Sequence, residues 1–359
     1  MEQPHKCLDF INPATGEKFG EVNMATPDEA KQAVLDMRAA FKVWSRKPVE
    51  ERVRILRRYQ ALIIDQVDPI TGVINRDTGK SRQDALAEVF MTVDMLNEHC
   101  RRAAEWLQRQ RVPSGLQFFK RCYVEPRPYG VVVVIAPWNY PFHLAMPSVL
   151  DALLAGNTVV LKPSEVTAAT GVLMEQLFQQ VPDLSPFVRV VHGDGAVGAA
   201  LVQAPPDFVF VTGSTPTGRK VSVAAAENLI PVACELGGKD AAIVLEDADL
   251  EAAAHWSVWG ACYNGGQSCV AIERAYVVES AYAAFVERCV DATRRLKVGY
   301  TTDLESPYYL GPISDPRQIT TIEHHVADAL AKARVCWSAA GVRACSTSRR
   351  SWSTSTTAC

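Results

Sequence analysis

The chain has 359 residues, and its 37 lysines and arginines nearly balance its 40 aspartates and glutamates, giving a net charge of −3. Charges of both signs are interspersed, which excludes a protein that binds nucleic acids mainly by neutralising phosphates. Hydrophobic residues make up 48% of the chain and charged residues 21%, a balance typical of soluble globular proteins. At about 150 residues per domain, we expect two or three domains.

The sequence contains neither a targeting signal for export nor a cysteine pattern typical of a metal site. The longest apolar run, Val131 to Pro137, is far shorter than the ~20 residues that cross a bilayer. The N-terminal residues contain no apolar segment of a secretion signal. The ten cysteines are too sparse for a disulfide scaffold and form no CxxC pair, so no metal is expected. We therefore expect a soluble cytoplasmic enzyme.

The first hundred residues are predicted to be helical. Thr26, Pro27 and Glu29 mark a helix start, because threonine caps the helix, proline suits its first position and glutamate completes a capping box. Apolar residues then recur at helical spacing, at Ala30, Val34, Met37, Phe41 and Trp44. A second helix is predicted from Pro48, with inward apolar positions at Val49, Val53, Leu56 and Ile63.

Short β-branched runs begin after Tyr129, and each is separated from the next by enough residues for a crossover helix. They lie at Val131–Ile135, Thr158–Leu161, Val188–Val191, Phe208–Val211 and Ala241–Leu245. Continuous apolar strands between helices indicate an α/β fold with a parallel sheet covered on both faces. Ligands of such sheets bind at the carboxyl ends of the strands.

Two segments depart from this pattern. The polar and aromatic stretch from Arg111 to Pro128 is predicted to form a β-hairpin arm outside the domain. A helix predicted from about Pro316 stops at Arg334, and the last 25 residues contain ten serines or threonines, three cysteines and no acidic residue. This tail is either a solvated extension or the product of a changed reading frame or aberrant splice, and the abrupt shift favours the latter.

Two glycine-containing turns are candidates for phosphate binding. Gly193 to Gly198 matches GxGxxG, but the next strand, Phe208 to Thr212, lacks the acidic residue that would hold a ribose, so we interpret the motif as a tight turn. In the following turn, Gly213 and Ser214 precede a predicted helix whose N-terminal N–H groups could face a phosphate. An ordinary capped helix explains that second turn equally well.

A nucleophile and a base are suggested by two glycine turns near residues 235 and 269. Cys269 follows Asn264-Gly265-Gly266-Gln267-Ser268, and a thiolate exposed there could attack a carbonyl carbon. A buried, inert cysteine is the common alternative, and we assign Cys262 to it. Glu235 ends an apolar strand before Leu236-Gly237-Gly238; burial would raise its pKa and make it a general base, unless turn amides simply hold it.

Polar residues also follow two of the predicted strands. Asn139, in Pro137-Trp138-Asn139-Tyr140-Pro141, could hold an oxyanion, or it could cap the next helix. Lys162 and Glu165, in Lys162-Pro163-Ser164-Glu165, could grip a ribose, or they could form a surface ion pair.

Taken together and in this order, PWNYP, KPSE, VTGSTPTG, ELGGK and NGGQSC resemble the aldehyde dehydrogenase superfamily. The resemblance runs from about Ile11 to Arg334. It implies a doubly wound NAD(P)-binding domain (1–112 and 129–236), an oligomerisation arm (113–128), a partial α/β catalytic domain (237–334) and a non-family, disordered tail (335–359).

The resemblance also implies residue roles. Cys269 would be the nucleophile that forms a thiohemiacetal and then a thioester, Asn139 would stabilise the oxyanion, and Glu235 would activate the hydrolytic water. The implied cofactor-binding residues are Pro137, Trp138, Lys162, Glu165, Gly213, Ser214 and Leu236. Because Glu165 would repel a 2′-phosphate, NAD is expected rather than NADP.

The expected function is NAD-dependent oxidation of an aldehyde to a carboxylic acid. Family members usually continue for another ~100 residues, with an E-x-F-G-P motif and a strand that pairs with a partner subunit, and neither is found in this sequence. We therefore expect weak or no activity, and the homodimer or homotetramer that the family suggests would lack its pairing strand. The alternatives are a non-catalytic cofactor-binding or hetero-oligomerising fragment, a thiol esterase and a coenzyme A-acylating enzyme. The sequence does not identify which aldehyde is the substrate.

Overall fold

The computed structural model describes residues 6–305, 309–332, 338–339 and 357–358. The chain divides into two compact units. The N-terminal unit comprises Met1–Leu8, Val22–Ile70 and Glu88–Glu235, and the C-terminal unit comprises Asp9–Glu21, Thr71–Ala87 and Leu236–Cys359. Residues 9–21 and 71–87, which the sequence analysis assigned to the cofactor domain, thus group with the C-terminal unit.

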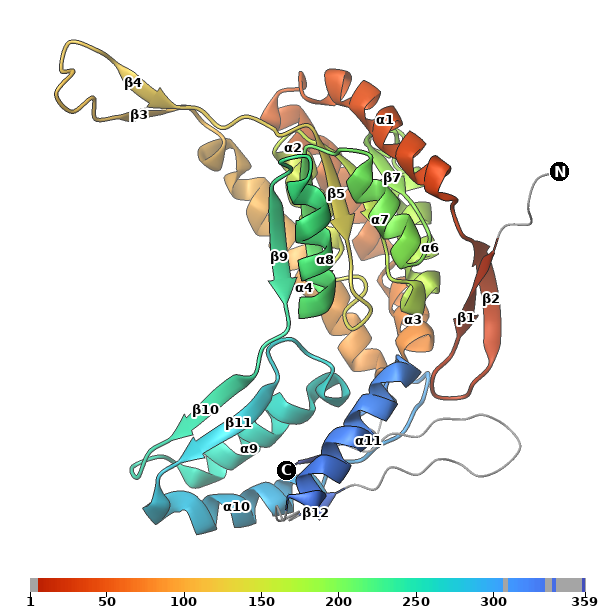
Figure 1. Ribbon diagram of the computed structural model, residues 1–359, viewed down its shortest axis with the longest axis vertical. Coiled ribbons are helices and arrows are strands. Elements are labelled where there is room, and N and C mark those ends of the chain that lie inside the picture. The colour runs from red at the N-terminus through yellow and green to blue at the C-terminus, as the bar shows by residue number, and fades with distance from the viewer. Residues whose placement is uncertain (1–5, 306–308, 333–337, 340–356, 359) are drawn as a thin grey trace. The chain divides into compact units, whose positions relative to one another are not determined.

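Helices and strands alternate in the middle of the chain, between residues 131 and 236 (Figure 1). The helices are α1 (Pro27–Trp44), α2 (Val49–Asp65), α3 (Val67–Thr78), α4 (Arg82–Trp106), α5 (Met146–Leu154), α6 (Ala168–Gln179), α7 (Gly195–Gln203), α8 (Thr215–Ala226), α9 (Leu250–Cys262), α10 (Glu279–Arg294) and α11 (Pro316–Ala331). The strands are β1 (Cys7–Ile11), β2 (Lys18–Asn23), β3 (Gln110–Val112), β4 (Cys122–Val124), β5 (Val131–Ile135), β6 (Thr158–Lys162), β7 (Val188–Val190), β8 (Phe208–Gly213), β9 (Val232–Leu236), β10 (Asp240–Val244), β11 (Ile272–Val277), β12 (Ser338–Ala339) and β13 (Thr357–Ala358).

A five-stranded sheet in the order β7-β6-β5-β8-β9 forms the centre of the N-terminal unit. The strands β7, β6, β5 and β8 are parallel, as the unalternated apolar runs predicted. Four of its strands were predicted to within about two residues, and β5 has the predicted bounds. Because β6 and β8 flank β5 on opposite sides, the chain changes direction across the sheet at β5 and β8, which makes this pair the switch point of a doubly wound sheet.

Helices cover both faces of this sheet. One face is packed by α1, α7 and α8, and the other by α2, α5 and α6. Successive side chains of β5 point to opposite faces of the sheet. Those of Val131 and Val133 belong to a core cluster with Ala30 and Val34 of α1. On the other side, the ring of Tyr59 stacks on Phe178 at 4.9 Å between centroids. The sheet is therefore buried on both faces, as its composition predicted.

The start of α1 has the predicted capping box. The backbone N–H of Glu29 donates to the Thr26 hydroxyl at 3.2 Å, and the Thr26 N–H donates to the Glu29 carboxylate at 2.7 Å. Four of the five predicted stripe residues are buried, and Phe41 is half-buried. These reciprocal bonds and the apolar stripe determine where α1 begins and which face it packs on the sheet.

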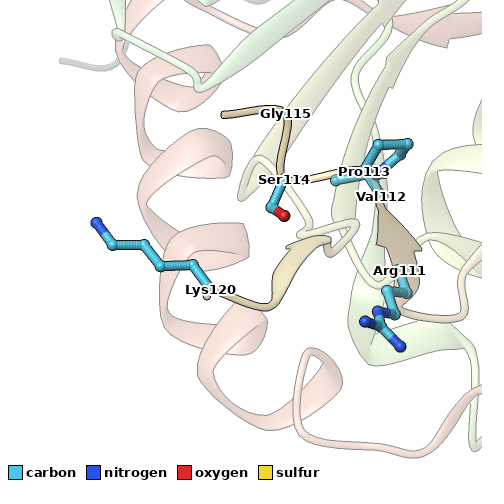
Figure 2. A pocket seen from close by; sticks show the side chains of 6 residues that line it. All are labelled: Arg111, Val112, Pro113, Ser114, Gly115 and Lys120. Carbon is cyan, nitrogen blue, oxygen red and sulfur yellow. The ribbon is translucent and has the colours of Figure 1, made fainter. Parts of the chain in front are cut away.

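The segment before β5 forms the predicted hairpin. Its strands β3 and β4 are antiparallel, with Arg111 opposite Tyr123. The connecting loop exposes three large apolar side chains, those of Leu116, Phe118 and Phe119. A shallow hollow of about 580 Å³ lies between the hairpin's own residues (Figure 2), and it is lined by Arg111, Val112, Pro113, Ser114, Gly115 and Lys120. None of the predicted site residues contributes to this hollow.

In the C-terminal unit, β10 and β11 form a separate two-stranded parallel sheet. The run Ala241–Leu245 therefore does not extend the larger sheet, although its apolar pattern matched the others; β9 is the fifth strand instead. Helices α9 and α10 pack together against β11. The buried side chains of α9 are small, namely Ala254, Val258 and Cys262.

The C-terminal end of the chain is described only in part. The predicted tail, 335–359, lies outside the described residues except for the short strands β12 and β13, which pair antiparallel. The helix predicted to stop at Arg334 is α11, which ends at Ala331. Among the residues that the structure describes, no helix is long and apolar enough to cross a membrane.

Candidate active site

Most of the predicted site residues lie along the carboxyl edge of the five-stranded sheet. Ile135 of β5 is opposite Lys162 of β6 on one side and Val211 of β8 on the other. Strands β5 and β6 thus end level with one another, and β8 runs two residues further, to Gly213. The residues at these strand ends or within four positions after them are Pro137, Trp138, Asn139, Lys162, Gly213 and Ser214. The N-terminal unit thus brings them to the switch point of the sheet, where ligands of doubly wound folds bind.

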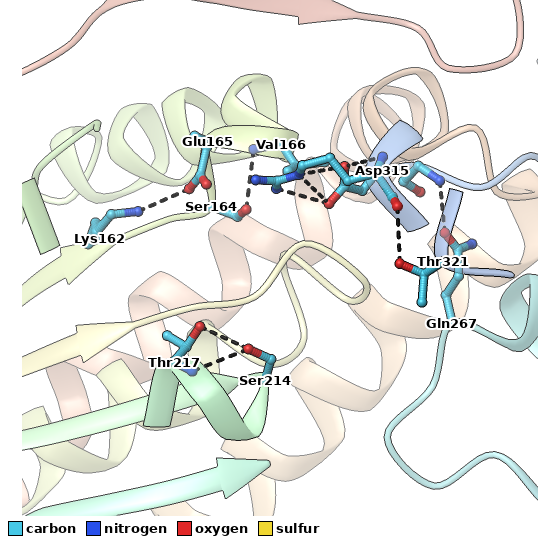
Figure 3. A network of polar contacts seen from close by, with 11 residues as sticks. Lys162, Ser164, Glu165, Val166, Ser214, Thr217, Gln267, Asp315 and Thr321 are labelled. Atoms are coloured by element: carbon cyan, nitrogen blue, oxygen red, sulfur yellow. Dashed lines mark hydrogen bonds and ion pairs between the residues drawn. The ribbon is translucent and has the colours of Figure 1, made fainter. Parts of the chain in front are cut away.

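Lys162 is a buried cation at this edge. Its ammonium group donates to the backbone oxygen of Pro163 at 3.0 Å and forms an ion pair with Glu165 at 3.4 Å (Figure 3). Burial lowers the pKa of Lys162, and the nearby Glu165 carboxylate opposes that shift. The Glu165 side chain is partly exposed, so the ion pair joins a buried lysine to a carboxylate that solvent can reach. This arrangement differs from the surface ion pair that the sequence left as an alternative.

The GxGxxG turn has an anionic cap. The Asp194 carboxylate accepts from the N–H groups of Ala196 and Val197 at 2.9 and 3.4 Å, at the N-terminus of α7. A Cβ at Gly193 would lie 2.4 Å from a methyl carbon of Val197, and one at Gly198 would lie 3.4 Å from Lys162 Cδ. Packing thus explains Gly193, whereas Gly198 would tolerate a Cβ, and a phosphate at this helix end would meet the Asp194 carboxylate.

The N-terminus of α8 has a neutral cap instead. The Ser214 hydroxyl accepts from the N–H of Thr217 at 3.3 Å and lies 2.9 Å from its hydroxyl (Figure 3). The first turn of α8 contains no acidic residue, and Ser214 to Thr217 are exposed. Hydroxyl groups and a helix N-terminus together favour an anion. Of the two helix ends, α8 is the one suited to a pyrophosphate.

Asn139 does not cap the following helix, because α5 begins at Met146 and its N-cap is Ala145. The loop after Asn139 is held by Glu88 of α4, whose fully buried carboxylate accepts from the N–H groups of Phe142 and His143 at 3.2 and 3.1 Å. The sequence analysis missed Glu88. The sequence does contain a signal for this role, because Glu88 lies in the apolar stripe of α4, where a carboxylate is unexpected.

Glu235 differs from its expected environment. It lies one residue before the end of β9, as predicted, but its side chain is exposed in the structure rather than buried. Strand β9 is at the edge of the sheet, beside β8 only, which leaves its carboxyl end open. The expectation that burial alone prepares this carboxylate as a base is therefore wrong. Leu236, which follows, is half-buried.

Cys269 lies in the C-terminal unit and is exposed. The turn before it contains three consecutive residues with left-handed backbone, Asn264 (φ 55°), Gly265 (φ 69°) and Gly266 (φ 73°). Two glycines adopt such a conformation at little cost, and asparagine tolerates it better than most residues. The tight turn reverses the chain at the end of α9 and presents the cysteine thiol to solvent, as the sequence predicted.

The side chain of Gln267 holds this turn in place, a role that the sequence analysis missed. Its amide nitrogen donates to the backbone oxygens of Asn264 at 2.8 Å and Pro312 at 3.3 Å. Its amide oxygen accepts from the N–H of Ser314 at 2.8 Å. A Cβ at Gly238 would lie 3.8 Å from the Cys269 backbone oxygen, so the cysteine loop passes beside the turn that follows β9.

Comparison with known proteins identifies the family of this chain. The sequence profile of the aldehyde dehydrogenase family matches residues 1–349. This chain belongs to the aldehyde dehydrogenase family. The match extends beyond residue 335, where the sequence analysis placed the start of a non-family tail. The mixed α/β fold with a parallel sheet is also the fold of solved members of the family.

Two curated relatives illustrate the range of the family. The 4,4′-diapolycopene aldehyde oxidase of a Methylomonas species is 39% identical over 325 residues, which cover 90% of this chain and 61% of that protein. A candidate succinate-semialdehyde dehydrogenase (NADP+) of Mycobacterium ulcerans is 32% identical over 330 residues, which cover 92% of this chain and 63% of that protein. This chain thus spans less than two thirds of the length of these relatives.

Among solved structures, a candidate aldehyde dehydrogenase of Anabaena variabilis, PutA, is similar over 97% of this chain and 73% of its own length. The TM-score is 0.89 and the sequence identity 34%. The aldehyde dehydrogenase fold therefore covers nearly all of the chain.

Proposed function

We propose that this chain carries the machinery for oxidising an aldehyde to a carboxylic acid with NAD as hydride acceptor. The observation that carries the proposal is the exposed Cys269, which follows a left-handed turn that the Gln267 side chain holds by three hydrogen bonds. A cysteine in such a turn is presented to a ligand rather than packed in a core.

In the proposed reaction the Cys269 thiolate forms a bond to the aldehyde carbon, and the carbonyl oxygen becomes an oxyanion. The side-chain amide of Asn139 and the backbone N–H of Cys269 would donate hydrogen bonds to that oxygen. Such donors stabilise charge that develops in the transition state, and losing one typically costs about 10²–10³-fold in rate. The Glu88 carboxylate, which accepts from the N–H groups of Phe142 and His143, supports the loop that carries Asn139.

The N-terminal unit fits a dinucleotide. The neutral cap of α8 suits a pyrophosphate, and the paired Lys162 and Glu165 suit the hydroxyl groups of a ribose. When bound, NAD supplies the hydride acceptor through which the thiohemiacetal on Cys269 becomes a thioester. Pro137, Trp138, Gly213 and Leu236 are proposed to line the same site.

Glu235 is proposed to take a proton from the water that hydrolyses the thioester. Its exposed position at the end of β9 leaves the carboxylate accessible to such a water. Attack by that water on the thioester carbon breaks the carbon–sulfur bond, releases the carboxylic acid and restores Cys269.

The preference for NAD rests on Glu165. A partly exposed carboxylate at the position proposed for the ribose would repel a 2′-phosphate. The relative from M. ulcerans is named for NADP, so the preference is a specific proposal for this chain.

The test is an absorbance assay for NADH with purified protein and an aldehyde series. We expect turnover that Cys269→Ala abolishes and that Cys7→Ala leaves intact, because Cys7 is an exposed cysteine far from the turn in sequence. NADH formation that survives Cys269→Ala would refute the proposed nucleophile. Ester hydrolysis that needs Cys269 but not NAD would instead support the thiol esterase that the sequence left open.

The hairpin arm is proposed to mediate self-association. Leu116, Phe118 and Phe119 are exposed at its loop, and exposed apolar patches of this kind mark interaction surfaces. In size-exclusion chromatography, the combined variant Leu116→Ser, Phe118→Ser and Phe119→Ser should form a smaller assembly than the parent. An unchanged retention volume would contradict this role.

A further inference from the structure

The loop of the hairpin arm presents large apolar side chains to solvent. Leu116 is 98% exposed, Phe118 87% and Phe119 73%. The two phenylalanine rings meet edge to face, with 5.8 Å between their centroids. We name these three residues the apolar tip. Apolar surface of this extent is unfavourable in water, so the tip calls for a partner that covers it.

Two successive turns shape the loop that carries the tip. The N–H of Gln117 donates to the backbone oxygen of Ser114 at 3.1 Å, and the N–H of Lys120 donates to that of Gln117 at 2.8 Å. Below the loop, β3 and β4 are paired along all three of their residues. The tip is therefore carried by a hydrogen-bonded loop on a paired stem.

Positive charge surrounds the base of the tip. All four charged side chains between residues 106 and 124 are basic and exposed, namely those of Arg109, Arg111, Lys120 and Arg121. We name these four residues the basic collar. Arg111 lies one residue before the end of β3, and Lys120 and Arg121 directly precede β4. Three of the four cations thus lie where the stem meets the loop, directly below the apolar tip.

Two members of the collar share the hollow of the arm. Arg111 and Lys120 line it together with Ser114 (Figure 2). Cationic groups and a hydroxyl around an open hollow suit a phosphate group. Nearby, the Arg109 guanidinium carbon lies 3.8 Å from the centroid of the Tyr123 ring on β4. Tyrosine rings and basic side chains are the groups that proteins place at the level of lipid head groups.

Self-association of the arm, proposed above, explains the apolar tip but not the basic collar. Two arms that met through their tips would bring two sets of like charges together. A nucleic acid would attract the collar and stack on the phenylalanines, but it has no apolar interior to cover Leu116. The partner that complements both parts is apolar inside and anionic at its surface.

We infer that the hairpin arm binds the surface of an anionic lipid bilayer. The apolar tip would enter the boundary between head groups and acyl chains, and the basic collar would contact the lipid phosphates. Self-association and lipid binding use the same tip, so one arm can serve only one of them at a time. The inference goes beyond the proposed oxidation of an aldehyde and requires neither Cys269 nor NAD.

Flotation of the full chain with lipid vesicles tests this inference. Vesicles of equal parts phosphatidylcholine and phosphatidylglycerol should bind the protein about tenfold or more tightly than vesicles of phosphatidylcholine alone, and 0.5 M NaCl should remove this difference. Arg111→Gln with Lys120→Gln should weaken binding about twentyfold, at about fivefold for each cation. Phe118→Ser with Phe119→Ser should weaken it about tenfold or more for each ring.

Helix α1 supplies matched controls from the same unit. Lys31→Gln with Lys42→Gln removes two exposed cations, and Leu35→Ser with Val43→Ser removes two exposed apolar side chains. Both control variants should bind anionic vesicles as the parent does. Equal weakening in the controls, or unchanged binding in either arm variant, would overturn the inference. So would equal affinity for vesicles with and without phosphatidylglycerol.

Two further measurements separate lipid from other partners. If the chain binds an oligothymidylate but no anionic vesicle, and both arm variants lose that binding, the arm is a nucleic-acid surface and the inference is wrong. If no vesicle binds and the arm variants change only the retention volume in size-exclusion chromatography, the arm joins copies of the chain and the inference is again wrong. Vesicle binding that depends on the arm, with NADH formation absent, would support the inference and count against the proposed oxidation alone.

Discussion

The buried carboxylate of Glu88 offers a sharp prediction about the loop that carries Asn139. One of its oxygens accepts from the N–H groups of Phe142 and His143 in this loop. A hydrogen bond to a charged group contributes about 1.5–3 kcal/mol, and an unsatisfied buried N–H costs a comparable amount. We therefore expect Glu88→Ala to lower the free energy of unfolding by about 3–5 kcal/mol.

The amide variant should be milder. In Glu88→Gln the side-chain oxygen can still accept both backbone N–H groups, but without the negative charge, so we expect a loss of about 1–2 kcal/mol. Glu98→Gln is the matched control, because Glu98 lies on the same helix and its ion pairs with Arg101 and Arg102 are at the surface. Surface pairs of this kind contribute about 0.5 kcal/mol or less.

The assay combines denaturant unfolding with amide hydrogen exchange of the peptide that contains Phe142 and His143. Exchange isolates the local effect even if the two units unfold in separate steps. Faster exchange in Glu88→Ala, intermediate exchange in Glu88→Gln and unchanged exchange in Glu98→Gln are expected. If the free energy of unfolding of Glu88→Ala lies within about 0.5 kcal/mol of the parent value and the amide exchange of this peptide is unaltered, the anchoring role is refuted.

Three further predictions address other parts of the chain. Gly79→Ala should lower the Tm and destabilise the protein by about 2 kcal/mol or more, because Gly79 has φ +74° and a Cβ there would lie 2.3 Å from a proline ring carbon. The control is Gly72→Ala on α3, where a Cβ would meet open space, and this variant should be neutral or stabilising. Alkylation at pH 8 followed by peptide mapping should modify Cys269 well before Cys100, since Cys269 is exposed whereas burial raises the pKa of Cys100 to about 11; equal rates would contradict this. Glu165→Gln should raise the NADP-to-NAD ratio of kcat/KM about tenfold by removing the repulsion of a 2′-phosphate, and an unchanged ratio would show that Glu165 does not select the cofactor.

Local chemistry made much of the N-terminal unit predictable. The run Val131–Ile135 is β-branched throughout, and it forms β5 with those bounds. Thr26 and Glu29 form the expected capping box because its bonds join residues only three positions apart. The exposed thiol of Cys269 likewise follows from the adjacent glycines, which permit the left-handed turn. In each case the decisive contacts are close in sequence.

Long-range contacts account for what the sequence did not predict. The partner of β10 is β11, Ile272–Val277, whose charged Glu273 and Arg274 hide its strand character, so the separate sheet was not foreseen. Glu88 meets its partners more than fifty positions away. The exposure of Glu235 depends on β9 being an edge strand, and edge position is a property of the assembled sheet.

The burial of Lys162 has a practical consequence for lysine-directed chemistry. Its ammonium group is almost wholly enclosed, while Lys31 and Lys239 on the surface are open to reagents such as formaldehyde with borohydride. Methylation of the native protein should therefore spare Lys162, and the appearance of a methyl group there would record opening of the strand end. A single lysine thus provides a covalent footprint of when this edge of the sheet opens.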